Sequence, residues 1–481
     1  MKIRKNISII VCMFLFLSSC SQDFIDFIPT SSATIDLIYK TDKDFLDALT
    51  ATYTPIRDAY QNFYIFGDLR GDDSWCEMFK NRSTTYSDQF TLNSSDGSVS
   101  TAWQRYYQAI FRVNTILSKL EDFDVTTIPR KNRYIGEARF LRALCYFDLI
   151  RIFGAVPAVT TPVGVQDAYL TPREPVENIY NNIIIPDLLA AENALLASYS
   201  GSDVGKPTIG AAKALLGKAY LTMGDFSKAE SKLMELTSMN YALLDDYNAL
   251  FDYSNKRHSE YIFNIEYEHG VNGGSQFTNA FLPNSVEMQL FYGITGYGDE
   301  YNNPTQVLID LFEDHDLRKE MTVGIIGGFY DATNTFIELP VFTSQTYTKK
   351  YITPTPARND SRADWKVIRY ADVLLMLAEA MNENGQTAQA IPYLNMIRKR
   401  AGVNEYPLTI SQAETRDAIM KERRLELSFE GHRWFDLVRT GKAYEVMREY
   451  GMTEYMTVFP IPLSQVQLIN NPAIMPQNTG Y

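Results

Sequence analysis

The segment "AAKALLGKAYLTMGDFSKAESKLMEL", residues 211–236, indicates the fold class of this chain. Large and small residues stand side by side in it, as in Leu216-Gly217, with Tyr220 one helical turn further on. A Gly224-Asp225 turn follows, and Leu233 lies in the second run. Small residues allow two helices to approach closely while large residues fill the gap between them. The segment therefore predicts a pair of antiparallel helices.

A second stretch repeats the same pattern. In "RYADVLLMLAEAMNENGQTAQAIPYLNMIRKR", residues 369–400, two helical runs flank an Asn384-Gly385 turn. The spacing in both stretches is similar to a tetratricopeptide repeat, although an ordinary helical hairpin is the alternative. We predict a mostly α fold whose helical pairs are scattered along the sequence and form a scaffold, not a continuous solenoid. The four predicted units lie at about residues 103–153, 174–238, 366–402 and 412–446.

Two irregular regions, at about residues 66–98 and 240–362, separate these units. The stretch 275–303 has no helical or strand period, and the stretch 66–86 combines a tryptophan with acids and arginines. Long loops rich in aromatic residues are usually functional. A pyranose ring lies flat on an aromatic side chain while Asp, Asn and Arg bind its hydroxyls. The predicted glycan-binding residues are Trp75, Asp68, Arg70, Asp73, Asn81, Tyr292, Tyr297 and Tyr301.

The start of the chain reads as an export signal. Lys2, Arg4 and Lys5 precede an apolar run about eleven residues long, which is too short to cross a bilayer. "LSSC", residues 17–20, looks like a bacterial lipobox, and a plain signal peptide is the alternative. We predict a signal peptide over residues 1–19 and a body over 20–481. Diacylglycerol on Cys20 would anchor that body to a membrane.

Composition and motifs exclude several function classes. The net charge is −13, and it falls by three, to −16, without residues 1–19, so nucleic acid is not an expected partner. No nucleophile elbow, phosphate loop or His-Glu-x-x-His motif occurs, and we expect no catalytic residue, metal or cofactor. Acid neighbours such as Asp72-Asp73 and Glu313-Asp314 arise by chance in a chain with 58 acids. Cys76 and Cys145 are expected to be reduced and inert.

Several stretches together resemble one protein family. They are "YIGEARFLRALCYFDLIRIFGAVP" (134–157), "LFEDHDLRK" (311–319), "IRYADVLLMLAEAMNENG" (368–385), "RLELSFEGHRWFDLVRTGK" (424–442), "VFPIPLSQVQLINNP" (458–472) and "QNTGY" (477–481). Taken in order, they resemble the SusD/RagB family of Bacteroidetes outer-membrane lipoproteins. The resemblance implies a SusD-like, mostly helical fold with four tetratricopeptide-like units, and a loop-rich half with few short strands that holds a glycan site.

The same resemblance implies a function. The protein would stand lipid-anchored on the outer membrane, facing the exterior. It would capture oligosaccharide and deliver it, uncleaved, to a SusC-like TonB-dependent transporter. Two alternatives stay open: a lipoprotein glycoside hydrolase with paired carboxylates, and a tetratricopeptide scaffold that binds a protein and no sugar.

Residue patterns in and near these stretches also predict which side chains are buried. Trp103 and Trp365 stand beside helical runs and are expected in the core. In residues 424–442, charges such as Glu426 and Glu430 alternate with apolar residues. That alternation predicts a helical turn buried on one side, with ion pairs at its margin.

Overall fold

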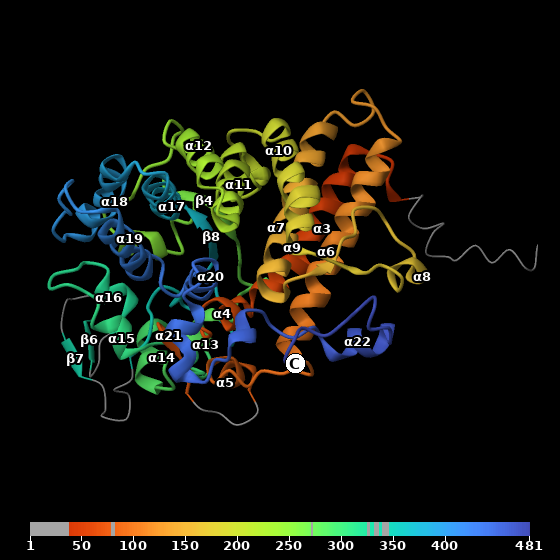
Figure 1. The fold of residues 1–481 in the computed structure, drawn as a ribbon. Helices are drawn as coiled ribbons and strands as arrows, with labels where there is room; N and C mark the ends of the chain where they lie inside the picture. Colours follow the sequence, from red (N-terminus) through yellow and green to blue (C-terminus); the bar gives the residue numbers. More distant parts are fainter. Residues whose placement is uncertain (1–37, 78–81, 271–272, 325–327, 331–335, 339–345) are drawn as a thin grey trace, which may run out of the picture.

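The computed structural model describes residues 38–481, apart from 78–81, 271–272, 325–327, 331–335 and 339–345. Figure 1 shows two halves. Long helices form an arc along one edge, and short helices, short strands and loops gather along the opposite edge around α5, α13 and α14. The predicted mostly α fold class is confirmed. No helix in the described ranges has both the length and the apolar character needed to cross a bilayer.

The long helices pack in one unbroken row. Each contacts the next in the order α3, α6, α7, α10, α11, α12, α17 and α19, and α18 packs on α17 (Figure 1). The helical pairs are therefore separated in the sequence but not in space, because α17, which follows β8, packs against α12. The helices are α3 (Asp42–Tyr60), α6 (Gly97–Glu121), α7 (Lys131–Phe153), α9 (Val176–Ile179) with a π turn (Tyr180–Ile184), α10 (Ile185–Ala194), α11 (Ile209–Met223), α12 (Phe226–Leu236), α17 (Tyr370–Glu383), α18 (Thr387–Ala401), α19 (Gln412–Leu427), α20 (Arg433–Arg439) and α21 (Ala443–Met447).

The remaining elements are short. Among the described residues, four antiparallel pairs of strands are formed by β1 (Ser74–Trp75) with β5 (Asn303–Pro304), β2 (Val156–Pro157) with β3 (Arg173–Glu174), β4 (Tyr261–Ile265) with β8 (Trp365–Arg369), and β6 (Gly328–Tyr330) with β7 (Phe336–Glu338). The short α-helices are α4 (Phe63–Gly67), α5 (Ser83–Asp88), α8 (Val165–Ala168), α13 (Phe277–Phe281), α14 (Val286–Tyr292), α15 (Gln306–Ile309), α16 (Lys319–Thr322) and α22 (Leu463–Ile469). Single 3-10 turns span Gly201–Asp203, Asn248–Phe251, Arg448–Tyr450 and Glu454–Thr457. The stretch 275–303, which shows no helical period, thus contains two short helices, α13 and α14.

The α11–α12 pair shows why its sequence folds this way. The Thr208 hydroxyl accepts a hydrogen bond from the Ala211 amide and starts α11. Gly224, at a φ of +77°, ends the helix in the left-handed region. Gly217 meets the next helix, since a Cβ there would lie 2.6 Å from the Leu233 side chain. The Leu-Gly pattern therefore reflects close contact between two helices.

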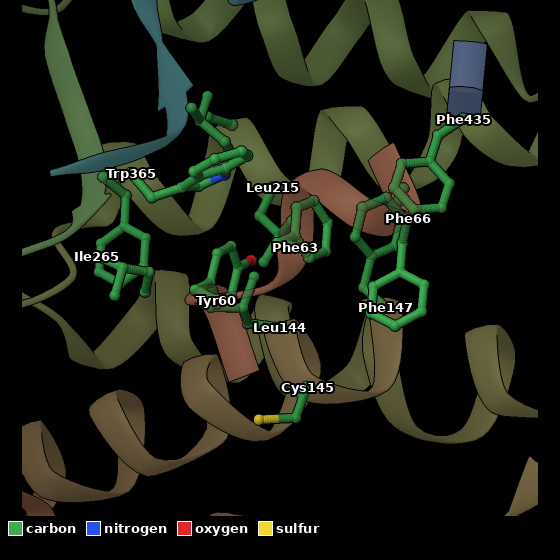
Figure 2. Packing of buried hydrophobic residues seen from close by; sticks show 14 of the residues in the cluster. Tyr60, Phe63, Phe66, Leu144, Cys145, Phe147, Leu215, Ile265, Trp365 and Phe435 are labelled. Atoms are coloured by element: carbon green, nitrogen blue, oxygen red, sulfur yellow. The ribbon is translucent and has the colours of Figure 1, made fainter. Parts of the chain in front are cut away.

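An aromatic core joins the N-terminal helices to the C-terminal ones. Figure 2 shows Tyr60, Phe63 and Trp365 among the buried residues of this cluster. The rings of Tyr60 and Phe63 stack with centroids 4.8 Å apart, and Trp365 meets Phe63 edge-on at 5.9 Å. Trp103 and Trp365 are 4% and 1% exposed, which confirms that both are core residues. Edge-to-face and offset contacts are the favoured geometries for such rings.

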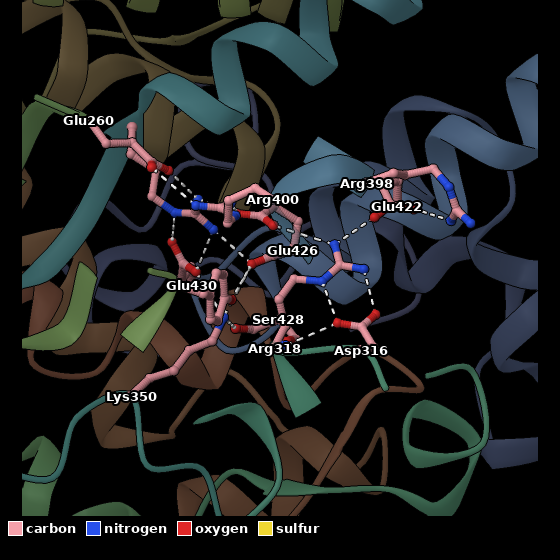
Figure 3. A network of polar contacts seen from close by, with 12 residues as sticks. Glu260, Asp316, Arg318, Lys350, Arg398, Arg400, Glu422, Glu426, Ser428 and Glu430 are labelled. Carbon is pink, nitrogen blue, oxygen red and sulfur yellow. Dashed lines mark hydrogen bonds and ion pairs between the residues drawn. The ribbon is translucent and has the colours of Figure 1, made fainter. Parts of the chain in front are cut away.

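A buried network of ion pairs crosses from the helical half to the loops. Arg369, at the end of β8, donates hydrogen bonds to Glu260, Glu426 and Glu430. Arg400 and Arg318 add further bonds to Glu426. The other members, drawn in Figure 3, are Lys350, Arg398, Asp316 and Glu422.

The position of these charges corrects the sequence prediction. Glu426 is fully buried and Glu430 is 2% exposed, so their ion pairs lie in the interior and not at the margin of the helix. Burial alone would raise the pKa of Glu430, but Arg369 and Lys350 hold it at about 2. Each carboxylate is tolerated because several cations and hydrogen bonds surround it. The alternation of charged and apolar residues could not reveal this, since partners come from four distant segments.

The two described cysteines are buried and unpaired, as predicted. Cys145 lies in α7 within the core (Figure 2). Burial, together with the nearby Asp88 carboxylate, raises the pKa of the Cys76 thiol to about 12. A thiol with so high a pKa forms almost no thiolate at neutral pH and is chemically inert.

Replacing Trp103 by alanine tests the core. The indole packs against Phe153 of α7 with ring centroids 5.2 Å apart, so its loss leaves a cavity between two helices. We expect Trp103→Ala to lower the free energy of unfolding by ~3–5 kcal/mol in urea titrations. Phe111 lies on the same helix but is 46% exposed, and Phe111→Ala should cost less than 1 kcal/mol. Equal losses in both variants would contradict the assignment of Trp103 to the core.

Candidate functional site

The structure brings the two irregular regions together. Ser74 and Trp75 of β1 pair with Pro304 and Asn303 of β5, so the segment around residue 75 lies beside the end of the stretch 275–303. The Glu77 amide continues the pairing by donating to the Glu300 carbonyl at 3.2 Å. Aromatic candidates from segments more than 200 residues apart therefore share one edge of the molecule.

One buried asparagine fixes the loop that carries Tyr297. Asn279, on α13, donates from its amide nitrogen to the carbonyls of Thr295 and Tyr297 at 3.2 and 3.1 Å. Its amide oxygen accepts from the Asn359 backbone at 2.9 Å, which ties in a second loop. All three contacts involve a side chain with no exposed surface. The loop is thus held in one conformation by its backbone, and its side chains are left to face outward.

Glycines let this loop turn, as its sequence predicts. Gly293 and Gly296 have φ values of +65° and +86°, a region that other residues rarely adopt. A Cβ on Gly296 would lie 2.9 Å from the Arg358 side chain, and one on Gly298 would lie 2.1 Å from the Leu282 carbonyl. Glycine is therefore required both for the turn and for close approach.

Tyr297 is the most exposed aromatic candidate. Its ring is 53% exposed, and the Arg358 guanidinium lies 4.1 Å from the ring centroid. Arg358 also donates to both oxygens of Asp299, at 2.8 and 2.7 Å. Burial raises the pKa of Asp299, whereas Arg358 and Arg82 oppose that rise. An aromatic face, a guanidinium and a carboxylate thus meet at one point of the surface, which we call the Tyr297 cluster (Tyr297, Asp299, Arg358).

The other aromatic candidates are less accessible. Trp75 is half-buried, and its indole N–H donates to the Pro304 carbonyl at 3.1 Å. Tyr301 is half-buried against the main core. Tyr292 packs on a small cluster that includes Met288, and its hydroxyl lies 3.1 Å from that of Tyr347. Only part of each of these rings remains for a ligand.

Three polar candidates prove to be structural. Asp68, Arg70 and Asp73 are at most 3% exposed, so the prediction that they bind sugar is wrong. Asp68 accepts from the Gly431 amide and from Asn302, and burial raises its pKa to about 7. Local sequence could not show this, because the partners lie more than 200 residues away. The fourth candidate, Asn81, falls outside the described residues.

Arg70 and Asp73 have partners from the end of the chain. The Arg70 guanidinium lies 4.3 and 4.6 Å from the ring centroids of Phe90 and Phe459. Asp73 pairs with Arg424, and the adjacent Asp72 accepts from both Arg424 and Arg433. These residues hold the first irregular region against the start of α20.

Sequence reasoning missed two members of the Tyr297 cluster. Arg358 lies in a loop with no recognisable motif, and Asp299 appears as one acid among many. Asp299 directly follows Gly298, which was its only signal, whereas Arg358 had none. Within the described ranges, no group of His, Cys, Asp or Glu side chains is arranged to hold a metal ion. The geometry suits a neutral, hydroxyl-rich ligand that stacks on a ring and exchanges hydrogen bonds with a charged pair.

Two protein-family models match this chain. The model described as "SusD family" matches residues 331–481, and the one described as "Starch-binding associating with outer membrane" matches residues 23–221. The two matches, which lie in different parts of the chain, make it similar to SusD-like proteins in both its N-terminal and C-terminal parts. SusD-like protein P38 of Formosa agariphila is 28% identical over all of both chains, which makes this a full-length relationship.

Solved structures of SusD-like proteins have the same fold. A "Laminarin binding SusD-like protein" is 29% identical, with a TM-score of 0.77 over 92% of this chain and 100% of that one. A SusD homolog from Bacteroides thetaiotaomicron has a TM-score of 0.81 at 23% identity, covering 93% of this chain and 99% of that one. The arrangement of helices and loops is therefore shared by SusD-like proteins of quite different sequence.

A stability measurement separates structural acids from surface residues. Because Asp73 is buried against Arg424, Asp73→Ala leaves the Arg424 guanidinium with one carboxylate fewer. We expect the free energy of unfolding, measured by urea titration, to fall by about 3 kcal/mol. Tyr297→Ala removes an exposed ring and should cost less than about 1 kcal/mol. If Asp73→Ala unfolds at the wild-type urea concentration, Asp73 is not structural.

Proposed function

We propose that this SusD-like protein captures oligosaccharide at the cell surface and delivers it to a SusC-like TonB-dependent transporter. The Tyr297 cluster is the observation that carries the proposal, because it offers an exposed ring beside a fixed guanidinium and carboxylate. The relative named for laminarin binding supports a β-glucan such as laminarin as the first ligand to test. In this proposal the protein binds its glycan and does not cleave it.

The two alternatives have less support. A glycosidase needs two carboxylates facing one substrate, but Asp72 and Asp73 are buried against arginines, and Glu313 pairs with Arg398 and Lys421. A protein-binding scaffold would leave the exposed Tyr297 ring without a role. Neither alternative explains why Asn279 and three glycines fix the loop that presents this ring.

Glycan binding is tested with two ring variants. Stacking on one aromatic ring contributes ~1 kcal/mol or more, so we expect Tyr297→Ala to weaken binding about tenfold by calorimetry. Trp75→Ala should also weaken it, by a smaller factor, since that ring is half-buried. Phe111→Ala, an exposed ring on the helical half, is the matched control and should bind as wild type does.

The ligand search begins with laminarin and continues through plant, host and microbial glycans. Reducing ends should stay constant during long incubation with each bound glycan. If no glycan binds, or if both ring variants bind normally, this assignment of function and site fails. Release of reducing ends that disappears on changing one Asp or Glu would identify a hydrolase instead.

Lipid anchoring is a separate proposal. Cys20, at the end of the lipobox-like "LSSC", would carry diacylglycerol, and two acyl chains hold a protein stably to a membrane. We expect Cys20→Ala to move the protein from the membrane fraction to the soluble fraction without changing its melting temperature. Ser18→Ala changes a neighbouring residue and should leave the protein membrane-bound. A Cys20→Ala protein that stays with the outer membrane in cells lacking the transporter would refute the anchor.

A further inference from the structure

A cavity lies on the helical half, away from the Tyr297 cluster. Its volume is about 460 Å³, within the usual range of about 300–1,000 Å³ for small-molecule pockets. It is formed by the α10–α11 connection, the turn after α12 and the start of β4, and its lining includes Tyr199, Tyr241 and Tyr261. Figure 1 places α10, α11 and α12 on the opposite edge from α13 and α14.

Each of the three tyrosine hydroxyls at this cavity makes a long hydrogen bond to a neighbouring described residue. Tyr199 accepts from the Leu196 amide at 3.4 Å, and Tyr261 donates to the Gly205 carbonyl at 3.3 Å. Tyr241 lies 3.4 Å from the Thr208 hydroxyl. Well-formed bonds from a hydroxyl are about 2.7–2.8 Å long. Each phenol therefore keeps hydrogen-bonding capacity for a ligand.

The fold reserves space for one of these rings. Gly210 opens α11 beside Tyr241, and a Cβ on Gly210 would lie 2.0 Å from the Tyr241 hydroxyl oxygen. The other face of Tyr241 stacks on Tyr370, with centroids 6.1 Å apart. The wall of the cavity is thus fixed before any ligand arrives.

The charges around the cavity are internally balanced. Arg257 pairs with Glu266 at 2.7 Å, and Lys206 lies 2.9 Å from Asp203 and 3.6 Å from Glu137. Lys206 Nζ is itself shielded from solvent, so these charged groups are held by one another.

We infer that this cavity is a second glycan-binding site. Aromatic walls suit the apolar face of a sugar ring, and the tyrosine hydroxyls suit its rim. Balanced charges favour a neutral ligand over an anion or a cation. The inference rests on the proposed function, because it assumes that the natural ligand is an oligosaccharide. The protein would then hold a glycan at both edges.

Methionine methyl groups allow the two sites to be observed separately. Met239 lines the cavity, whereas Met288 packs with Tyr292 beneath the loop of the Tyr297 cluster. With protein carrying ¹³C-methyl methionine, titration with laminarin oligosaccharides should shift both resonances. If laminarin does not bind, the glycan identified in the binding screen replaces it.

Two substitutions test the cavity itself. Ser198 is exposed at its edge, so Ser198→Trp should fill it and weaken the binding reported by Met239 at least tenfold, while Met288 responds as before. Tyr199→Ala should weaken the same response by removing one wall. Ser231→Trp places the same bulk on an exposed position of α12 outside the cavity, and it should change neither the Met239 nor the Met288 response to the glycan. Thermal unfolding of each variant verifies the fold.

The outcomes separate this inference from the proposed function. If Met288 shifts to saturation and Met239 does not move, the second site is refuted and the proposed function stands. A Met239 shift that persists unchanged in both cavity variants also refutes the second site. If neither resonance responds to any glycan, both proposals fail.

Discussion

The contact between Arg369 and its three glutamates is the constraint on which the two halves of the molecule depend. Arg369 ends β8 and starts α17, while Glu260, Glu426 and Glu430 come from the loop before β4 and from the end of α19. Removing Arg369 would leave three buried carboxylates with fewer cations around them, and breaking a buried ion pair costs about 3–5 kcal/mol. The network thus fixes where the loop-rich half begins relative to the helical row, and with it the position of every loop that the helices support.

Within that frame, the candidate site is positioned by backbone contacts. Asn279 holds two loops through their main-chain atoms, so the Tyr297 cluster is presented without using the side chains that would meet a ligand. This arrangement lowers the entropy lost on binding, because the loop is already ordered. The residues that hold the loop are also different from those that would contact a ligand. Surface side chains can therefore be substituted while Asn279 and the glycines keep the shape of the loop.

Local patterns in the sequence were enough to predict the helical pairs, the core tryptophans and the two irregular regions. The contacts that require Gly217 and Gly224 lie within residues 211–236, so this segment alone was enough to predict its helical pair. The polar part of the site could not be predicted in this way. Asp73 looks like a surface acid beside Trp75, and its burial depends on Arg424, 351 residues later. Arg358 has no motif at all, and only the folded chain places it on Tyr297.

The contacts between the first irregular region and α19–α20 also set the order in which the chain can fold. Asp68, Asp72 and Asp73 meet their partners 351 to 363 residues further along. Contacts of such separation form late and slow folding, because a long loop must close first. Until residues 424–433 are available, the segment carrying Trp75 holds three carboxylates with no place to be buried. Closure of this edge is therefore a late folding event, and it depends on the same stretch that completes α19 and supplies Glu426 and Glu430 to Arg369.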